Sequence, residues 1–154
     1  MTATATAARA IRRAALLVAL ALWSREARAQ YFSVSGSPAT MRISTATAGL
    51  ALNAVTDAST KYTILEFSGG HHEITAQINT AMPAGVTLTV ALAAPSGATS
   101  TGPVALGVAA QPVVTNISTA FASNTITYTL SATPAAGVVP VQSRTVTFTV
   151  VATP

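Results

Sequence analysis

Hydrophobic and polar residues alternate strictly along four segments of the chain, and threonine fills most of the polar positions. The clearest case is the last segment, in which Val146, Phe148 and Val150 are separated by threonines. A period of two places the apolar side chains on one face of a β-strand and the threonines on the other. We therefore predict strands with one buried and one solvated face at Glu73–Asn79, Gly85–Ala93, Asn124–Ala132 and Arg144–Ala152.

The same alternation predicts which side chains form the core. The apolar members of these segments should be buried, namely Leu88, Val90, Ile126, Leu130, Val146 and Phe148. Their polar neighbours should face water, as represented by Thr87, Thr127 and Thr147.

Shorter apolar runs predict further strands, and clusters of Gly, Pro and Ser mark the turns between them. The weaker candidates are Tyr31–Val34, Thr40–Ser44, Lys61–Phe67, Val104–Val108 and Val113–Ile117. Gly49 and the threonines around it limit Thr45–Ala54 to a helical turn at most. About eight or nine short strands without a long helix predict an all-β fold, a single immunoglobulin-like antiparallel β-sandwich.

The first 29 residues have a different pattern from the rest of the chain. A basic start is followed by the apolar run Ala14–Trp23, and then by small residues at Ala27 and Ala29. This layout predicts a signal peptide at residues 1–29 that is cleaved between Ala29 and Gln30. A membrane anchor would need about 20 apolar residues, roughly twice this run. We therefore expect a secreted, periplasmic or cell-surface protein with one domain at residues 30–154, exported by either the general or the twin-arginine route.

Charge is scarce once the leader is set aside. Three basic residues balance three acidic ones after residue 29, and 74–143 contains no Asp, Glu, Lys or Arg. The charged residues are Arg42, Lys61, Arg144, Asp57, Glu66 and Glu73. Nucleic-acid binding and polybasic attachment to a membrane both need clustered Lys or Arg, so we expect neither partner. The chain has no Cys, which leaves stability to an ordinary hydrophobic core.

Side chains that usually carry catalysis are few. His71 and His72 are the only histidines, and no nucleophile motif or phosphate-binding glycine loop accompanies them. We therefore expect a protein that is not an enzyme and that uses no cofactor.

One local cluster has the residue types of a metal site. His71 and Glu73 would share a strand face, and Glu66 would join them if Ser68-Gly69-Gly70 closed a hairpin. Zinc sites normally use three or four protein ligands, and one segment supplies two. The favoured interpretation is a solvated hairpin tip without a metal; the alternative is a weak site of His71, Glu73 and Glu66.

The leader, the threonine-rich strands and the final segment RTVTFTVV (144–151) resemble those of secreted bacterial surface β-sandwich proteins, especially fimbrial and spore-coat-U-like subunits. The chain departs from these in lacking a Cys pair and a near-terminal Tyr on its last strand. The resemblance implies that an extended N-terminal segment of one subunit fills an incomplete sheet of the next. Gln30–Ser44 would be that segment, with self-association through Tyr31, Phe32 and Val34, although Gly36 and Pro38 interrupt it.

Two functions follow from this reasoning. The first is a secreted, non-enzymatic structural or adhesive protein that self-associates into a homo-oligomer or filament. The alternative is a secreted module that binds carbohydrate or another surface. Flat Thr/Ser faces with an unpaired strand edge would favour the first, and clustered exposed aromatic side chains would favour the second.

Overall fold

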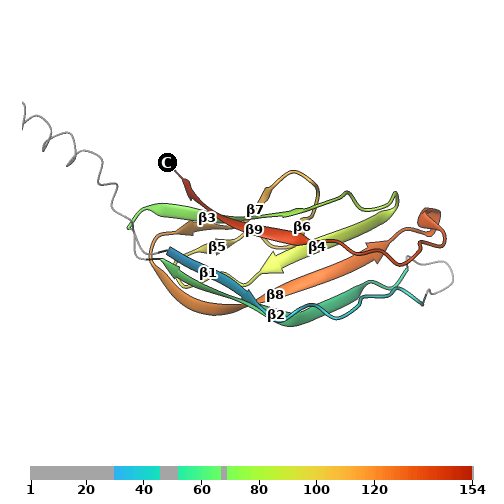
Figure 1. Ribbon diagram of the computed structural model, residues 1–154, viewed down its shortest axis with the longest axis horizontal. Helices are drawn as coiled ribbons and strands as arrows, with labels where there is room; N and C mark the ends of the chain where they lie inside the picture. Colours follow the sequence, from blue (N-terminus) through green and yellow to red (C-terminus); the bar gives the residue numbers. More distant parts are fainter. Residues whose placement is uncertain (1–29, 46–51, 67–68, 154) are drawn as a thin grey trace, which may run out of the picture.

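Two antiparallel β-sheets packed face to face make up the chain in the computed structural model, which describes residues 30–45, 52–66 and 69–153 (Figure 1). The five-stranded sheet has the order β1-β2-β8-β4-β6, with β1 at Gln30–Ser35, β2 at Val55–Glu66, β8 at Ala120–Ala132, β4 at Val86–Leu92 and β6 at Val104–Ala105. The four-stranded sheet has the order β5-β7-β3-β9, with β5 at Thr99–Ser100, β7 at Gln111–Ile117, β3 at His71–Ile78 and β9 at Val146–Thr153. The predicted all-β sandwich is confirmed.

Helical structure in the described part of the chain is limited to one short turn, η1 at Pro134–Ala136. Within those residues, no helix is long and apolar enough to cross a bilayer.

The four strongly alternating segments form β3, β4, β8 and β9, with ends that differ from the prediction by at most four residues. The largest surprise is β2, which starts at Val55, well before the predicted Lys61. Thr40–Ser44 forms no strand, because Gly36 at φ +82° and Pro38 turn the chain out of the ladder that β1 makes with β2. The predicted strand Val104–Val108 is reduced to the two residues of β6.

The predicted core is partly confirmed. Leu88, Val90 and Ile126 are buried between the sheets. Leu130, Val146 and Phe148 are instead half-buried, because Leu130 lies toward the end of β8 and the other two lie on β9, at the edge of its sheet. On the opposite strand faces Thr87 and Thr147 are exposed, as predicted, and Thr127 is half-exposed.

The predicted hairpin around residues 68–70 is wrong. β2 and β3 lie in different sheets, so the connection between them crosses from one layer of the sandwich to the other. The alternation of each strand then turns one face toward the other sheet, and Glu66 at the end of β2 is fully buried there.

Two glycines with nearly equal positive φ angles provide a test of the packing at the end of the sandwich near η1. Gly85 has φ +78°, and a β-carbon on it would meet the Thr133 hydroxyl oxygen at 2.8 Å and Ala136 at 3.0 Å. Gly97 has φ +82° with nothing within 4 Å. Gly97→Ala should cost about 1–2 kcal/mol of unfolding free energy from the left-handed conformation alone. Gly85→Ala should cost about 1–3 kcal/mol more from overpacking, which chemical denaturation of both variants will measure.

Candidate functional site

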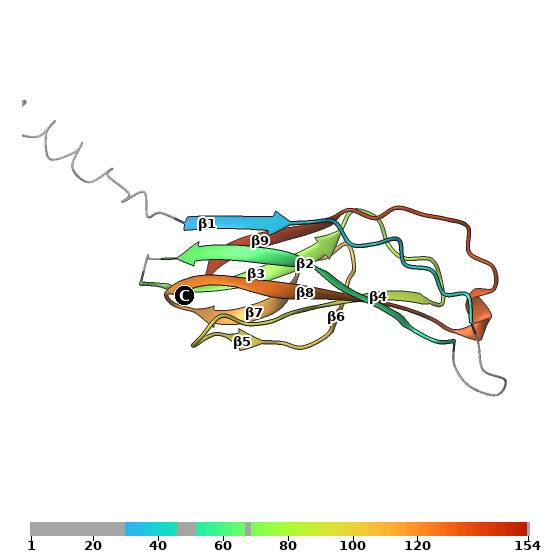
Figure 2. The same ribbon diagram turned by 90° about the horizontal axis from the view of Figure 1, so that it is seen from below.

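The two long sides of the sandwich differ in how their sheet edges end. β1 and β9 run along one side, and β5 runs along the other (Figure 2). The strands on the second side are short, since β5 and β6 have two residues each. On the first side β1 has six residues and β9 has eight, and neither contains a charged side chain. We call this first side the open side.

A groove opens between the two sheets on the open side. It encloses a cavity of about 220 Å³ lined by Val34, Gly36, Ser37, Pro38, Thr60, Tyr128, Arg144, Val146 and Phe148. The lining combines residues just after β1 with the start of β9, so the cavity lies where Gly36 and Pro38 take the chain away from β2. The half-buried state of Val146 and Phe148 follows from this opening.

Two buried polar atoms of residues lining the groove have no hydrogen-bond partner within the described part of the chain. They are the hydroxyl oxygen of Thr60, a residue that is 1% exposed, and Nε of Arg144. The other guanidinium nitrogens of Arg144 donate to the carbonyl oxygens of Ser143 at 2.9 Å and Ala81 at 3.0 Å, and to the Gln142 side chain. Buried polar atoms without partners cost about 1–3 kcal/mol each, so the groove would gain from a partner that brings acceptors.

The other polar groups near the groove hold fixed protonation states around neutral pH. Burial, reinforced by the negative charge of Asp57, raises the pKa of Tyr128 to about 12. The pKa of Asp57 is lowered, chiefly by the hydrogen bond from the Ser59 hydroxyl. Asp57 also accepts from the backbone N–H of Ala39 at 3.3 Å, which fastens the segment after β1 to β2.

Of the predicted self-association residues, Phe32 and Val34 face the space between the sheets, and Tyr31 faces outward. The ring of Phe32 lies 5.8 Å from that of Tyr62 and 6.4 Å from that of Phe148, so it links β1 to both sheets. Val34 lines the groove and is exposed there. Tyr31 pairs across the ladder with Leu65 on the outer face of the five-stranded sheet.

The suggested metal ligands do not come together. His71 and Glu73 lie on the outer face of β3, whereas Glu66 is buried between the sheets. No group of three or more His, Asp or Glu side chains is placed to hold a metal ion in the described ranges. The alternative that joined Glu66 to His71 and Glu73 depended on the hairpin, and the crossing between sheets separates them.

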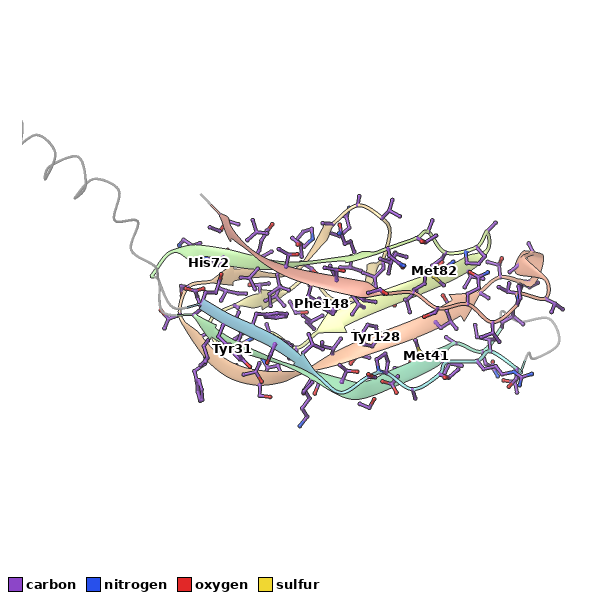
Figure 3. The ribbon with its side chains drawn as sticks, in the orientation of Figure 1. Tyr31, Met41, His72, Met82, Tyr128 and Phe148 are labelled. Atoms are coloured by element: carbon purple, nitrogen blue, oxygen red, sulfur yellow. The ribbon has the colours of Figure 1, made fainter. Side chains whose placement is uncertain are left out.

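Glu66 instead lies near His72, a contact that the sequence reasoning missed. The Gln30 side-chain amide donates to Oε2 of Glu66 at 2.7 Å, and Nδ1 of His72 lies 3.8 Å from the same oxygen. Figure 3 shows His72 and Tyr31 toward the end of the molecule where β1 begins, with Tyr128 and Phe148 nearer the middle. Alternation could have identified His72, because it has the same parity as Ile74 and Ile78 on the core face of β3.

No family model, curated protein or solved structure matches this chain. We therefore infer the function from the geometry of the open side.

Proposed function

We propose that this protein is a secreted, non-enzymatic structural or adhesive component of a cell surface or extracellular matrix, and that it self-associates by strand addition on its open side. The observation that carries the proposal is the free edge of β9, eight uncharged residues long and next to the groove between the sheets. An exposed, uncharged strand edge is a template for pairing with another chain.

The backbone of β9 presents alternate residues to that free edge. Thr145, just before the strand, directs both of its backbone groups at Asn79: its carbonyl accepts from the Asn79 N–H, and its own N–H donates to the Asn79 side chain. In an antiparallel ladder the direction of these groups alternates along the strand. With the register Ile78↔Val146, the N–H and C=O groups of Phe148 and Val150 therefore point away from β3.

An added strand would also supply what the groove lacks. Polar side chains on its inner face can offer an acceptor to Nε of Arg144 and a hydrogen-bond partner to the hydroxyl of Thr60. Apolar side chains on its inner face would cover Val34, Val146 and Phe148. These three gains favour a strand as the occupant.

The proposal includes an immunoglobulin-like subunit, export with cleavage of the leader, and a source for the added strand. An immunoglobulin-like, fimbria-like arrangement is supported by a final strand that lies at a sheet edge beside the first. Export with cleavage between Ala29 and Gln30 is part of it, because Gln30 then begins β1 directly. Gln30–Ser44 is one source of the added strand, and β9 of a second copy is another.

A lysine on the β9 edge should convert the assembly to monomers. Thr149 is exposed on the outer face of β9, and Thr149→Lys places a charge on the edge strand, next to the side chains of an incoming strand. The unmodified exported protein should form oligomers or filaments at moderate concentration with little dependence on salt, because few charges take part. Sedimentation velocity and electron microscopy should show oligomers for the unmodified chain and monomers for Thr149→Lys.

The matched control is Thr87→Lys, which makes the same change at an exposed threonine of β4. That strand lies inside its sheet: it pairs with β8 along Val86–Leu92 and with β6 at Thr89 and Val90, so it leaves a shorter free edge for strand addition than β9 does. Thr87→Lys should therefore assemble like the unmodified protein. A chain that is monomeric at every concentration, or equal assembly of the two lysine variants, contradicts the proposal.

A further inference from the structure

A row of apolar side chains crosses the outer face of the five-stranded sheet at the end where β1 begins. The ladders pair Tyr31 with Leu65, and Leu65 with Phe121, so these three side chains stand side by side on β1, β2 and β8. Tyr31 is 52% exposed and Phe121 is 81% exposed. The row therefore presents two exposed aromatic rings on the outer face of the sheet, separated by two strand spacings, about 10 Å.

The next row along the same face consists of hydroxyl groups. Ser33 pairs with Thr63, which pairs with Ser123, and the Thr63 hydroxyl donates to that of Ser123 at 3.4 Å. Neither row contains a charged side chain, and the nearest one on this outer face of the ladders is Lys61, in the row after. Aromatic rings beside an uncharged band of hydroxyl groups form a surface with both apolar and hydrogen-bonding character.

We propose that Tyr31, Leu65 and Phe121 form a platform that binds a flat, neutral polysaccharide. A sugar ring has an apolar C–H face, which stacks on an aromatic ring, and a rim of hydroxyl groups, which the Ser33–Thr63–Ser123 row can meet. The absence of charge on the two rows matches an uncharged ligand. The distance between the two rings suits a ligand of at least two sugar units lying across the strands.

Size and charge argue against a protein or a membrane surface as the ligand of this platform. A fully buried aromatic side chain covers about 150–250 Å², and Tyr31 and Phe121 offer only the 52% and 81% of their surfaces that are exposed. The row therefore provides less than the roughly 500 Å² per partner that a stable protein interface needs. A membrane surface would call for clustered cationic side chains, and Lys61 stands alone beside the rows. The platform also lies on the outer face of its sheet and does not include the free edge of β9.

Depletion from solution by microcrystalline cellulose, a flat neutral polysaccharide, tests the proposal. We would carry out the assay on the exported protein in the Thr149→Lys background, so that multivalency does not mask single-site affinity. Cellulose should deplete this protein, and Tyr31→Ala and Phe121→Ala should each lower the partition coefficient about tenfold, the size of a moderate hot-spot loss.

Three further variants distinguish stacking on the aromatic rings from nonspecific hydrophobic adsorption. Val138 is fully exposed and lies outside the platform, so Val138→Ala should leave binding unchanged. Phe121→Tyr keeps the ring and should retain binding, whereas Phe121→Leu keeps apolar area without the ring and should lose it. Unaltered thermal melting of each variant will show that the fold is intact.

Several results would overturn the platform. These are no depletion of the parent protein, equal binding by Phe121→Leu and the parent, and ring variants that bind cellulose normally. A platform that contacts a second copy would instead show as a shift to smaller species when Phe121→Ala is made in the otherwise unmodified chain. If Thr149→Lys does not give monomers, that result contradicts strand addition at the β9 edge and says nothing about the platform. The self-association proposal and the polysaccharide proposal can therefore fail independently.

Discussion

Ile126→Ala is expected to lower the free energy of unfolding by about 2–5 kcal/mol. Ile126 is fully buried on β8, where it lies between Thr60 of β2 and Leu92 of β4 in the ladders of the five-stranded sheet. Its side chain faces the other sheet, so truncation removes buried apolar atoms and leaves a cavity that the paired strands cannot close. Urea denaturation should show a lower midpoint with an unchanged slope.

The control is Thr87→Ala on β4, where the side chain is exposed on the outer face. This substitution removes no core packing and should cost less than about 1 kcal/mol, within the range of β-strand propensities. Equal losses at Ile126 and Thr87 would mean that the two strand faces do not differ in burial, which contradicts both the alternation and the fold.

The alternation of apolar and polar residues identified the central strands, because strands in a β-sandwich require this pattern. A strand with one face on a core and one in water must alternate, and β3, β4 and β8 do so over most of their lengths. The first half of β2 was missed because Asp57 and Ser59 are poor strand formers. It is a strand because it pairs with the long β8, and the ladder shifts register between Asp57 and Thr60 to accommodate it.

Which strands share a sheet could not be read from the sequence. A short connection after Glu66 is compatible with a hairpin or with a crossing between layers, and only the pairing of β2 with β1 and β8 decides. The same limit applies to both candidate sites. The groove requires β1 and β9 to lie together from opposite ends of the chain, and the platform requires two registers that bring Tyr31, Leu65 and Phe121 into one row.

Deletion of residues 30–44 is expected to cost at least as much as a large core truncation. β1 forms a six-residue ladder with β2, and Phe32 packs against Tyr62 and Phe148. Loss of a packed Phe side chain alone costs about 3–5 kcal/mol, and the deletion also removes the hydrogen bond that Gln30 donates to the buried Glu66. Because a domain of this size has about 5–15 kcal/mol of stability, calorimetry should show a much lower melting temperature or no transition.

A peptide of residues 30–44 should restore part of the lost stability. Binding to the native state alone stabilises by about 2.7 kcal/mol at a hundredfold excess over Kd, so the melting temperature should rise with peptide concentration. A peptide carrying Phe32→Ser lacks the ring that contacts Tyr62 and Phe148 and should have little effect. An unchanged melting temperature on deletion, or equal rescue by both peptides, contradicts the role assigned to β1.

The rescue experiment also bears on how copies associate. In the intact chain β1 is joined to β2 through residues 36–54, so its effective concentration at its own docking site is about millimolar. A free copy of the segment must exceed that concentration to displace it, which disfavours exchange of β1 between folded molecules. The free edge of β9 faces no such competitor within the described part of the chain. We therefore expect excess peptide to rescue the deletion variant and to leave the oligomers of the intact protein unchanged, whereas dissolution of those oligomers by the peptide would show that β1 itself is exchanged.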